Sequence, residues 1–159
     1  MGALTIEMNG LEAIAMMTSA GAGLPAVLTK QLGLASILAK ATMREKAPVG
    51  VGGDKDGLKG SIGVTLIPEA LSSEIKPTMP YADAVETGSK PHWIPHGPDS
   101  ALAAWAKLKG INVYALAASI AKKGTKPHPY IEPTYEEVAP GVIALFASGV
   151  DAFLGGLFV

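Results

Sequence analysis

The three histidines are the residues whose type and spacing could bind a metal ion. His92 and His96 are separated by three residues, and His128 lies further along the chain. With Glu86 or Asp99, they could offer zinc three nitrogen ligands and one oxygen ligand. The metal motif in which a glutamate directly follows the first histidine is absent.

The residues around these histidines argue against a metal site. Trp93 and Pro95 lie between the first two histidines, and all three histidines lie in proline-rich segments. A helix that turns both rings to one side is therefore not expected. We expect loop histidines that pack on Trp93 or Tyr130 and bond to the backbone. The sequence predicts no metal and no cofactor.

Serine catalysis is a second chemistry that the residue types would allow. Ser61, Ser89 and Ser100 are candidate nucleophiles for a serine, histidine and aspartate constellation. None of them lies in the glycine-flanked pattern that holds a nucleophilic serine on a strained turn. The chain has no cysteine, so a thiol nucleophile, a thiolate metal site and a disulfide are all excluded.

Paired carboxylates could act as a general acid and a general base. The candidates are Glu86 with Glu132, and the adjacent Glu136 and Glu137. We expect Glu86, which precedes a tight turn, to accept backbone N–H bonds or to pair with a lysine. We expect Glu136 and Glu137 to favour a helix N-terminus electrostatically. The sequence therefore predicts a structural role for these residues and no enzymatic activity.

The basic residues form small groups, and one of them could contact nucleic acid. The net charge of −1 argues against a protein whose main task is to grip nucleic acid. If subunits form a ring around DNA, however, one group could line the channel and contact phosphates without reading sequence. The best candidates for such contacts are Lys122, Lys123 and Lys126.

The composition predicts one domain with a lightly charged surface. The chain has 159 residues, of which 48% are hydrophobic and only 17% charged. This length is enough to bury a real core, so we expect a single domain over residues 1–159. A surface with few charges suggests that neighbouring subunits or a membrane cover part of it. Residues 1–17 lack the basic start and clear cleavage site of a secretory signal.

Helical periodicity predicts a long helix over residues 25–46, which Ala47 and Pro48 end. A short helix is expected before it, over residues 11–19. The apolar residues of the long helix that recur at helical spacing, and are expected to face inward, are Val27, Leu28, Leu34, Ile37, Leu38 and Ala41.

A pair of helices is predicted in the second half of the chain. Asp99 or Ser100 can cap a helix that Gly110 ends, and Asn112 can cap another that Gly124 ends. The side chains expected to face inward from this pair are Leu102, Trp105, Leu108, Leu116 and Ile120.

Alternating residues predict a small antiparallel sheet. Residues 61–67, 71–75 and 81–86 each alternate over a short run, and residues 4–8 could add another strand. Gly88 is expected to supply a turn with positive φ after the last run. The predicted fold class is α+β: a small antiparallel sheet packed by a long helix in the N-terminal half, an inserted helix pair and a C-terminal helix.

Two loops are predicted to make contacts with partners. Residues 50–57 form a glycine-rich segment that is either a plain linker or an arm that orders on binding a neighbour. Residues 91–98 contain too many prolines for a helix or a central strand. The residues of these loops expected at a subunit or partner interface are Asp54, Lys55, Trp93, Ile94 and His96.

The C-terminal segment is unusually apolar. Thr134 and Glu137 have the spacing of a capping box for a last helix. Residues 138–159 carry a single charge, Asp151, and are long enough to cross a bilayer. A proline and several glycines interrupt the segment, and no lysine or arginine flanks it closely. We expect a buried terminal helix or packing tail, with a membrane anchor as the alternative.

Five short segments occur in a fixed order along the chain. They are Ala47-Pro48, residues 57–62 (Gly-Leu-Lys-Gly-Ser-Ile), residues 81–88 (Tyr-Ala-Asp-Ala-Val-Glu-Thr-Gly), a histidine- and proline-containing loop with a tryptophan-containing helix pair over residues 91–123, and residues 124–133 (Gly-Thr-Lys-Pro-His-Pro-Tyr-Ile-Glu-Pro). In this order, residues 10–137 resemble the family of neck, head–tail connector and tail-completion proteins of long-tailed bacteriophages.

This resemblance implies a compact α+β domain without catalytic residues. It implies a homomeric ring at the head–tail joint of the virion, assembled in the host cytoplasm. The implied partners are other copies of the chain, a portal-side adaptor or head-closure protein, a tail-tube or tail-terminator protein, and packaged DNA contacted without sequence preference. No membrane is implied.

Three other functions stay open at this point. A tail-terminator ring, which caps the tail tube, would fit the same residues. A membrane-associated protein would use residues 138–159 as its anchor. A metal-dependent hydrolase built on His92, His96 and His128 is the third possibility.

Overall fold

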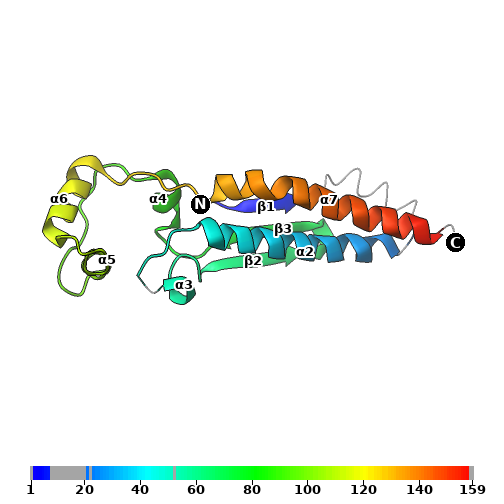
Figure 1. Ribbon diagram of the computed structural model, residues 1–159, viewed down its shortest axis with the longest axis horizontal. Coiled ribbons are helices and arrows are strands. Elements are labelled where there is room, and N and C mark those ends of the chain that lie inside the picture. The colour runs from blue at the N-terminus through cyan, green and yellow to red at the C-terminus, as the bar shows by residue number, and fades with distance from the viewer. Residues whose placement is uncertain (1, 8–20, 22, 52, 158–159) are drawn as a thin grey trace.

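The computed structural model describes residues 2–7, 21, 23–51 and 53–157, and the molecule is elongated (Figure 1). Two long helices run side by side along the body, a small sheet lies against them, and a pair of short helices extends beyond one end. The predicted α+β fold class is confirmed. The helix expected over residues 11–19 lies outside the described residues.

The two long helices are α2 (Gly23–Lys46) and α7 (Ile131–Leu157), and they pack antiparallel. Lys46 Nζ, at the end of α2, lies 2.6 Å from a carboxylate oxygen of Glu137 near the start of α7. Further along, Gly149 faces Gln31 so closely that any side chain at position 149 would overlap it. The long helix predicted over residues 25–46 is therefore confirmed, and its partner is the C-terminal helix.

The sheet has three antiparallel strands in the order β1-β3-β2. These are β1 (Leu4–Glu7), β2 (Ile62–Ile67) and β3 (Ser72–Pro77), with the 3-10 turn η1 (Pro68–Ala70) between the last two. β3 is central and β1 and β2 form the two edges. Three of the predicted strands are thus confirmed with slightly different bounds.

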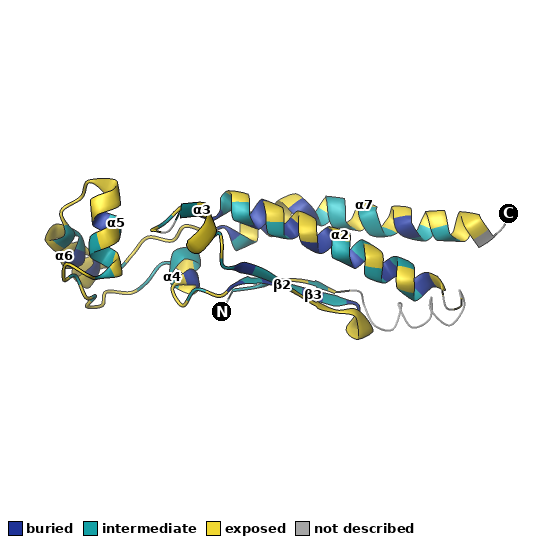
Figure 2. Ribbon diagram, turned by 90° about the horizontal axis from the view of Figure 1, so that it is seen from below, coloured by how far each residue is buried: buried dark blue, intermediate teal, exposed yellow. Residues whose placement is uncertain are grey.

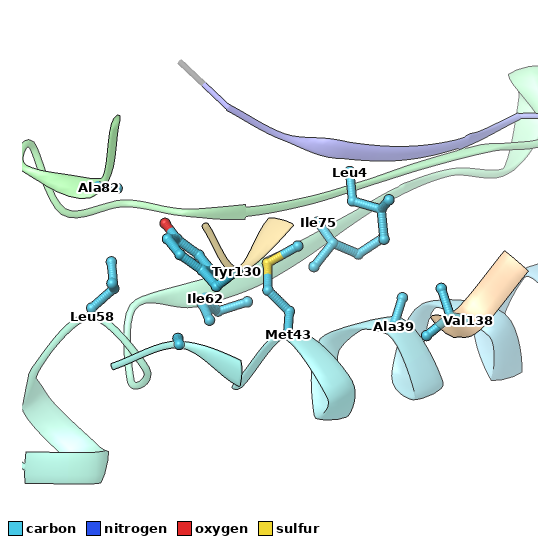
Figure 3. Packing of buried hydrophobic residues seen from close by; sticks show 10 residues of the cluster. Leu4, Ala39, Met43, Leu58, Ile62, Ile75, Ala82, Tyr130 and Val138 are labelled. Carbon is cyan, nitrogen blue, oxygen red and sulfur yellow. The ribbon is translucent and has the colours of Figure 1, made fainter. Parts of the chain in front are cut away.

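The main core lies between the sheet and α2 and is closed by the start of α7 (Figure 3). Met43 of α2, Ile75 of β3 and Tyr130 are each 0% exposed. Alternation on β3 puts Ser73 on the same face as Ile75, and the buried Ser36 hydroxyl meets the Ser73 hydroxyl at 2.7 Å. These two buried hydroxyls therefore satisfy each other across the core.

The strand predicted over residues 81–86 is wrong, because this segment forms the helix α4 (Ala82–Thr87). In this helix Ala82 is buried and Val85, three residues later, packs on the same core. Within the described chain β3 is paired on both sides, by β1 and by β2, so the segment has no place beside the central strand. The expected turn follows it: Gly88 has φ +75°.

The glycine-rich loop of residues 50–57 contains a single helical turn, α3 (Gly53–Asp56), where the sequence predicted linker or arm. The turn is bound to the rest of the chain. The Arg44 guanidinium donates to the Asp54 carbonyl at 3.2 Å, and Lys59 Nζ lies 3.6 Å from the Asp54 carboxylate. This segment is therefore anchored against α2.

The inward face predicted for α2 is wrong in its second half. Leu34 is 43% exposed, Ile37 67% and Leu38 39%. The buried face is carried by smaller residues on the opposite side, including Ala35 and Ala39. The sheet and α7 both contact α2, and small side chains allow such elements to pack closely. Buried and exposed positions alternate along the helix (Figure 2).

Residues 89–128 form a separate helical lobe beyond α4, and the other described residues form the body (Figures 1 and 2). The lobe contains α5 (Ala101–Lys109) and α6 (Val113–Lys123), which pack on each other. The Ser100 hydroxyl accepts the Ala103 N–H, and the Asn112 side chain accepts two N–H groups of α6. Both predicted caps are confirmed.

The buried face of the helix pair differs in part from the prediction. Ile120 is 7% exposed, as expected, but Leu108 is 60% exposed. Ala106 of α5 and Ala117 of α6 are buried. The buried positions of the pair are thus partly small residues, and Leu108 lies at the surface.

The two chain segments that connect the lobe to the body meet at residues 88–89 and 124–125, which we call the neck of the lobe. Ser89 and Thr125 exchange both backbone hydrogen bonds at 3.1 Å, and their hydroxyls lie 2.9 Å apart. Gly88 and Gly124 flank this bridge at φ +75° and +74°. A Cβ atom at Gly124 would overlap the Ser89 carbonyl. The two glycines therefore allow the strands of the neck to meet.

Replacing Gly124 by alanine should destabilise the neck. Gly124→Ala forces an L-residue into positive φ against the Ser89 carbonyl, which should lower the free energy of unfolding by about 1–3 kcal/mol. Urea unfolding measures this loss. Gly97→Ala is the matched control, since nothing lies within 4 Å of its Cβ position. Equal stability of both variants would contradict the account of the neck.

Candidate functional site

The carboxylate of Glu86 caps the N-terminus of α7. Its oxygens accept the Tyr130 N–H at 2.7 Å, the Ile131 N–H at 3.0 and 3.2 Å and the Glu132 N–H at 3.3 Å. The first N–H groups of a helix have no acceptor within the helix, and an anion there also meets the positive end of the helix dipole. The prediction that Glu86 accepts backbone N–H bonds is confirmed.

The capping box predicted for Thr134 and Glu137 is wrong. α7 begins at Ile131, so both residues lie inside it. The Thr134 hydroxyl donates to the Tyr130 carbonyl at 2.6 Å, and Glu137 pairs with Lys46. Glu86 supplies the cap from a distant part of the chain, so the expectation that Glu136 and Glu137 favour the N-terminus is also wrong.

Tyr130 is the largest fully buried side chain of the core. Its hydroxyl has no hydrogen-bond partner among the described residues. Burial raises the pKa of Tyr130 to about 12, and the negative charge of Glu86 adds to this effect. The ring thus fills the space below the cap, at the junction of α4, α7 and the sheet.

The three candidate serines take part in backbone structure. Ser61 donates to the Leu58 carbonyl at 2.8 Å, and Ser100 caps α5. Ser89 Oγ lies 3.4 Å from His92 Nδ1, but this nitrogen also lies 2.9 Å from the Lys90 carbonyl. A ring nitrogen that donates to a carbonyl cannot accept the proton of a serine.

The histidines do not come together with acidic residues. Among the described residues, no group of three or more histidine, aspartate or glutamate side chains is arranged to hold a metal ion. His92 and His96 place Nδ1 at 2.9 and 3.0 Å from the carbonyls of Lys90 and Ile94. The expected backbone bonding of the loop histidines is confirmed for these two.

An exposed aromatic row crosses the lobe. His96 packs edge-on against Trp93 at a centroid distance of 6.1 Å and against Tyr114 at 5.5 Å. Trp93 is 71% exposed and Tyr114 67% exposed. Ile94 and His96 are half-buried beside them. Large exposed aromatic side chains are typical of protein interfaces, so the prediction of an interface at Trp93, Ile94 and His96 stands as a hypothesis.

The lobe is strongly basic. Residues 89–128 contain six lysines and one aspartate, a net charge of +5, whereas the rest of the chain has seven basic and 13 acidic residues, a net charge of −6. All six lysines are exposed, and no described carboxylate lies within ion-pair distance of them. They are Lys90, Lys107, Lys109, Lys122, Lys123 and Lys126.

The other predicted interface residues, Asp54 and Lys55, lie on α3. Both are exposed, but the Asp54 backbone and carboxylate already bind Arg44 and Lys59. α3 lies near the end of α2 that faces the lobe (Figure 2). The structure therefore does not bring these residues together with the aromatic row.

A groove runs along β1 and the first half of α7, and no sequence pattern pointed to it. It consists of two adjoining cavities of about 350 and 390 Å³, which share Leu4, Thr5 and Tyr135. Its rim carries the carboxylates of Glu7 and Glu132, and no lysine or arginine of the described segments lines it. Only the pairing of β1 with β3 places this strand beside α7, so local sequence could not reveal the groove.

α7 is long and apolar, as expected for the C-terminal segment, but little of it is buried. The apolar stretch within Ile131–Gly156 has a mean hydropathy of 1.7, and only 11% of it is buried. By length and composition alone, the helix could cross a membrane. Ile143 is 70% exposed. The expectation of a buried helix is therefore wrong for much of its surface.

Comparison with protein families, with curated proteins and with solved structures found no match to this chain.

Removing the cap should loosen α7 and the core below it. Glu86→Ala leaves three backbone N–H groups without their acceptor, which should lower the free energy of unfolding by about 1–3 kcal/mol. Glu86→Gln keeps one carbonyl oxygen as an acceptor, so its free energy of unfolding should lie between those of the wild-type chain and Glu86→Ala. Chemical unfolding is the measurement, and Glu132→Ala, with an exposed side chain, is the control. A loss no larger than that of the control would contradict the capping role.

The raised pKa of Tyr130 predicts a loss of stability at high pH. The folded chain keeps this proton up to about pH 12, whereas the unfolded tyrosine releases it near pH 10. Stability is therefore fully present below pH 10 and falls as the pH rises toward 12. Tyr130→Phe should show a smaller fall between pH 9 and 11.5 in urea unfolding, and parallel curves for the two proteins would argue against this assignment.

Proposed function

We propose that this chain is a structural virion protein of a tailed bacteriophage. It forms a homomeric ring at the head–tail joint, as a neck or tail-completion protein, and is not an enzyme. The ring joins the DNA-filled head to the tail and continues the DNA channel. It contacts a portal-side adaptor or head-closure protein on one side and a tail-tube or tail-terminator protein on the other.

The observation that carries this proposal is the meeting of the family-like segments in one place. Ala47, Leu58 and Ile62 of the first two segments lie in the same core cluster as Ala82 and Tyr130. These residues are far apart in the sequence, and the fold brings them into one core. This shared core is consistent with the single structural unit that the resemblance implies, and it is the support that we offer for the proposal.

The surface also supports an assembly role. A closed ring with head-to-tail contacts needs two different complementary patches on each subunit. The basic lobe with its aromatic row and the acidic body with its groove are two such patches. The exposed apolar residues Ile37 and Ile143, at 67% and 70%, provide further surface for neighbours to cover.

DNA is part of the proposal as a partner without sequence recognition. Lys122, Lys123 and Lys126 are exposed and have no described carboxylate beside them. Lysines in this state can contact phosphates of DNA that passes through the ring.

Two alternatives remain proposals of lower rank. A tail-terminator ring would use the same surfaces at the end of the tail tube. A membrane-associated protein would use α7, which is long and apolar enough to cross a membrane by length and composition alone. Against the membrane, α7 packs along α2 for most of its length and carries Glu132, Glu136 and Glu137 in its first turns.

Electron microscopy of lysates from a phage that lacks this gene tests the proposal. We expect DNA-filled heads beside separate tails of normal length, because the joint between them is missing. Complementation with the wild-type gene is the control and should restore joined particles.

Two outcomes would count against this function. Tails of uncontrolled length would move the protein to the terminator position. Intact, infectious particles would contradict any connector role and would favour the membrane or enzyme alternatives.

A further inference from the structure

We propose that the helical lobe of one copy docks in the β1–α7 groove of the next copy, with the side chain of Trp93 as its anchor. This inference rests on the proposed homomeric ring and names the two surfaces that would build it. The occupant of the groove is a second copy of this chain.

The groove is open and has the character of an interface. β1 is an edge strand, so one side of its backbone has no strand partner in the described part of the chain. Tyr135 is 58% exposed and Ile143 70% exposed along the opposite wall on α7. Exposed apolar side chains around an unpaired strand edge are surfaces that proteins usually cover.

Charge complementarity points to the lobe as the occupant. Among the described residues, the groove is lined by Glu7, Glu86 and Glu132 and by no lysine or arginine. The lobe carries a net charge of +5 and the remainder of the chain −6. Opposite net charges of this size attract the lobe of one copy to the body of another. They also disfavour contacts between two lobes or between two bodies.

The shape of the lobe's loop favours a side-chain anchor over strand addition. Pro91, Pro95 and Pro98 cannot donate backbone hydrogen bonds, so residues 91–98 cannot extend the sheet as a regular strand. Trp93 is 71% exposed and can bring a large ring into the groove next to Tyr135. Buried tryptophans are among the strongest anchors at interfaces.

A copy cannot fill its own groove in this structure. The lobe extends beyond the α4 end of the body, and none of its residues lines either cavity (Figures 1 and 2). Because the two surfaces differ, each copy offers one lobe and one groove. Repeating such a contact gives a closed ring or an open filament.

Photo-crosslinking of the full chain tests the docking directly. The chain has no cysteine, so Thr5→Cys at the groove rim provides a unique thiol for a benzophenone probe. Chains labelled with ¹⁵N and unlabelled chains are mixed, irradiated and digested, so that mass spectrometry separates links between copies from links within one. We expect links between copies to peptides of residues 89–128.

Variants and controls make the outcome specific. Trp93→Ala should lower the yield of these links about tenfold. Leu108→Ala removes another exposed side chain of the same lobe and should leave the yield unchanged. A probe at Glu69→Cys, on the turn between β2 and β3, should not capture the lobe.

Three results would overturn the docking: links within one copy only, links between copies only outside residues 89–128, or no links between copies at all. Failure here is distinguishable from failure of the proposed function. If the deletion phage still makes unjoined heads and tails, the connector role stands and only the docking is wrong.

Discussion

The bond network of one carboxylate holds the architecture together. Glu86, at the end of α4, binds the first N–H groups of α7, which begins 45 residues later in the chain. This bridge sets where α7 starts, and so which residues of α7 face α2. It also closes the core over Tyr130 and brings both ends of the lobe to the same place, since the lobe is the segment between α4 and α7. A shift of α4 would therefore move the core, the groove and the lobe together.

Local signals in the sequence were enough for several elements. Ser100 and Asn112 were expected to cap helices and do so, because a capping side chain bonds to N–H groups only two or three residues away. Gly88, Gly110 and Gly124 all have positive φ, as turns and helix ends with glycine predict. The expected backbone bonding of His92 and His96 is likewise local, since each ring nitrogen lies near a carbonyl two residues away.

Long-range contacts decided the features that the sequence did not predict. Residues 81–86 alternate like a strand, but β1 pairs with β3 and the Glu86 carboxylate accepts the Tyr130 N–H at the start of α7. The segment forms the helix α4 instead. α2 has apolar residues on more than one face, and periodicity cannot tell which face the sheet will cover. Leu34 and Ile37 consequently remain at the surface. The groove and the charge contrast between lobe and body depend on the assembled chain in the same way.

The central claim is that this chain is an assembly part whose two unlike surfaces meet between copies at the head–tail joint. Cryo-electron microscopy of that joint, in virions of the phage that encodes the chain, tests it most directly. The account predicts a ring of copies around the DNA channel, with the lobe of each copy seated against the next. Density for the chain elsewhere in the virion, or no density for it at the joint, would contradict the account.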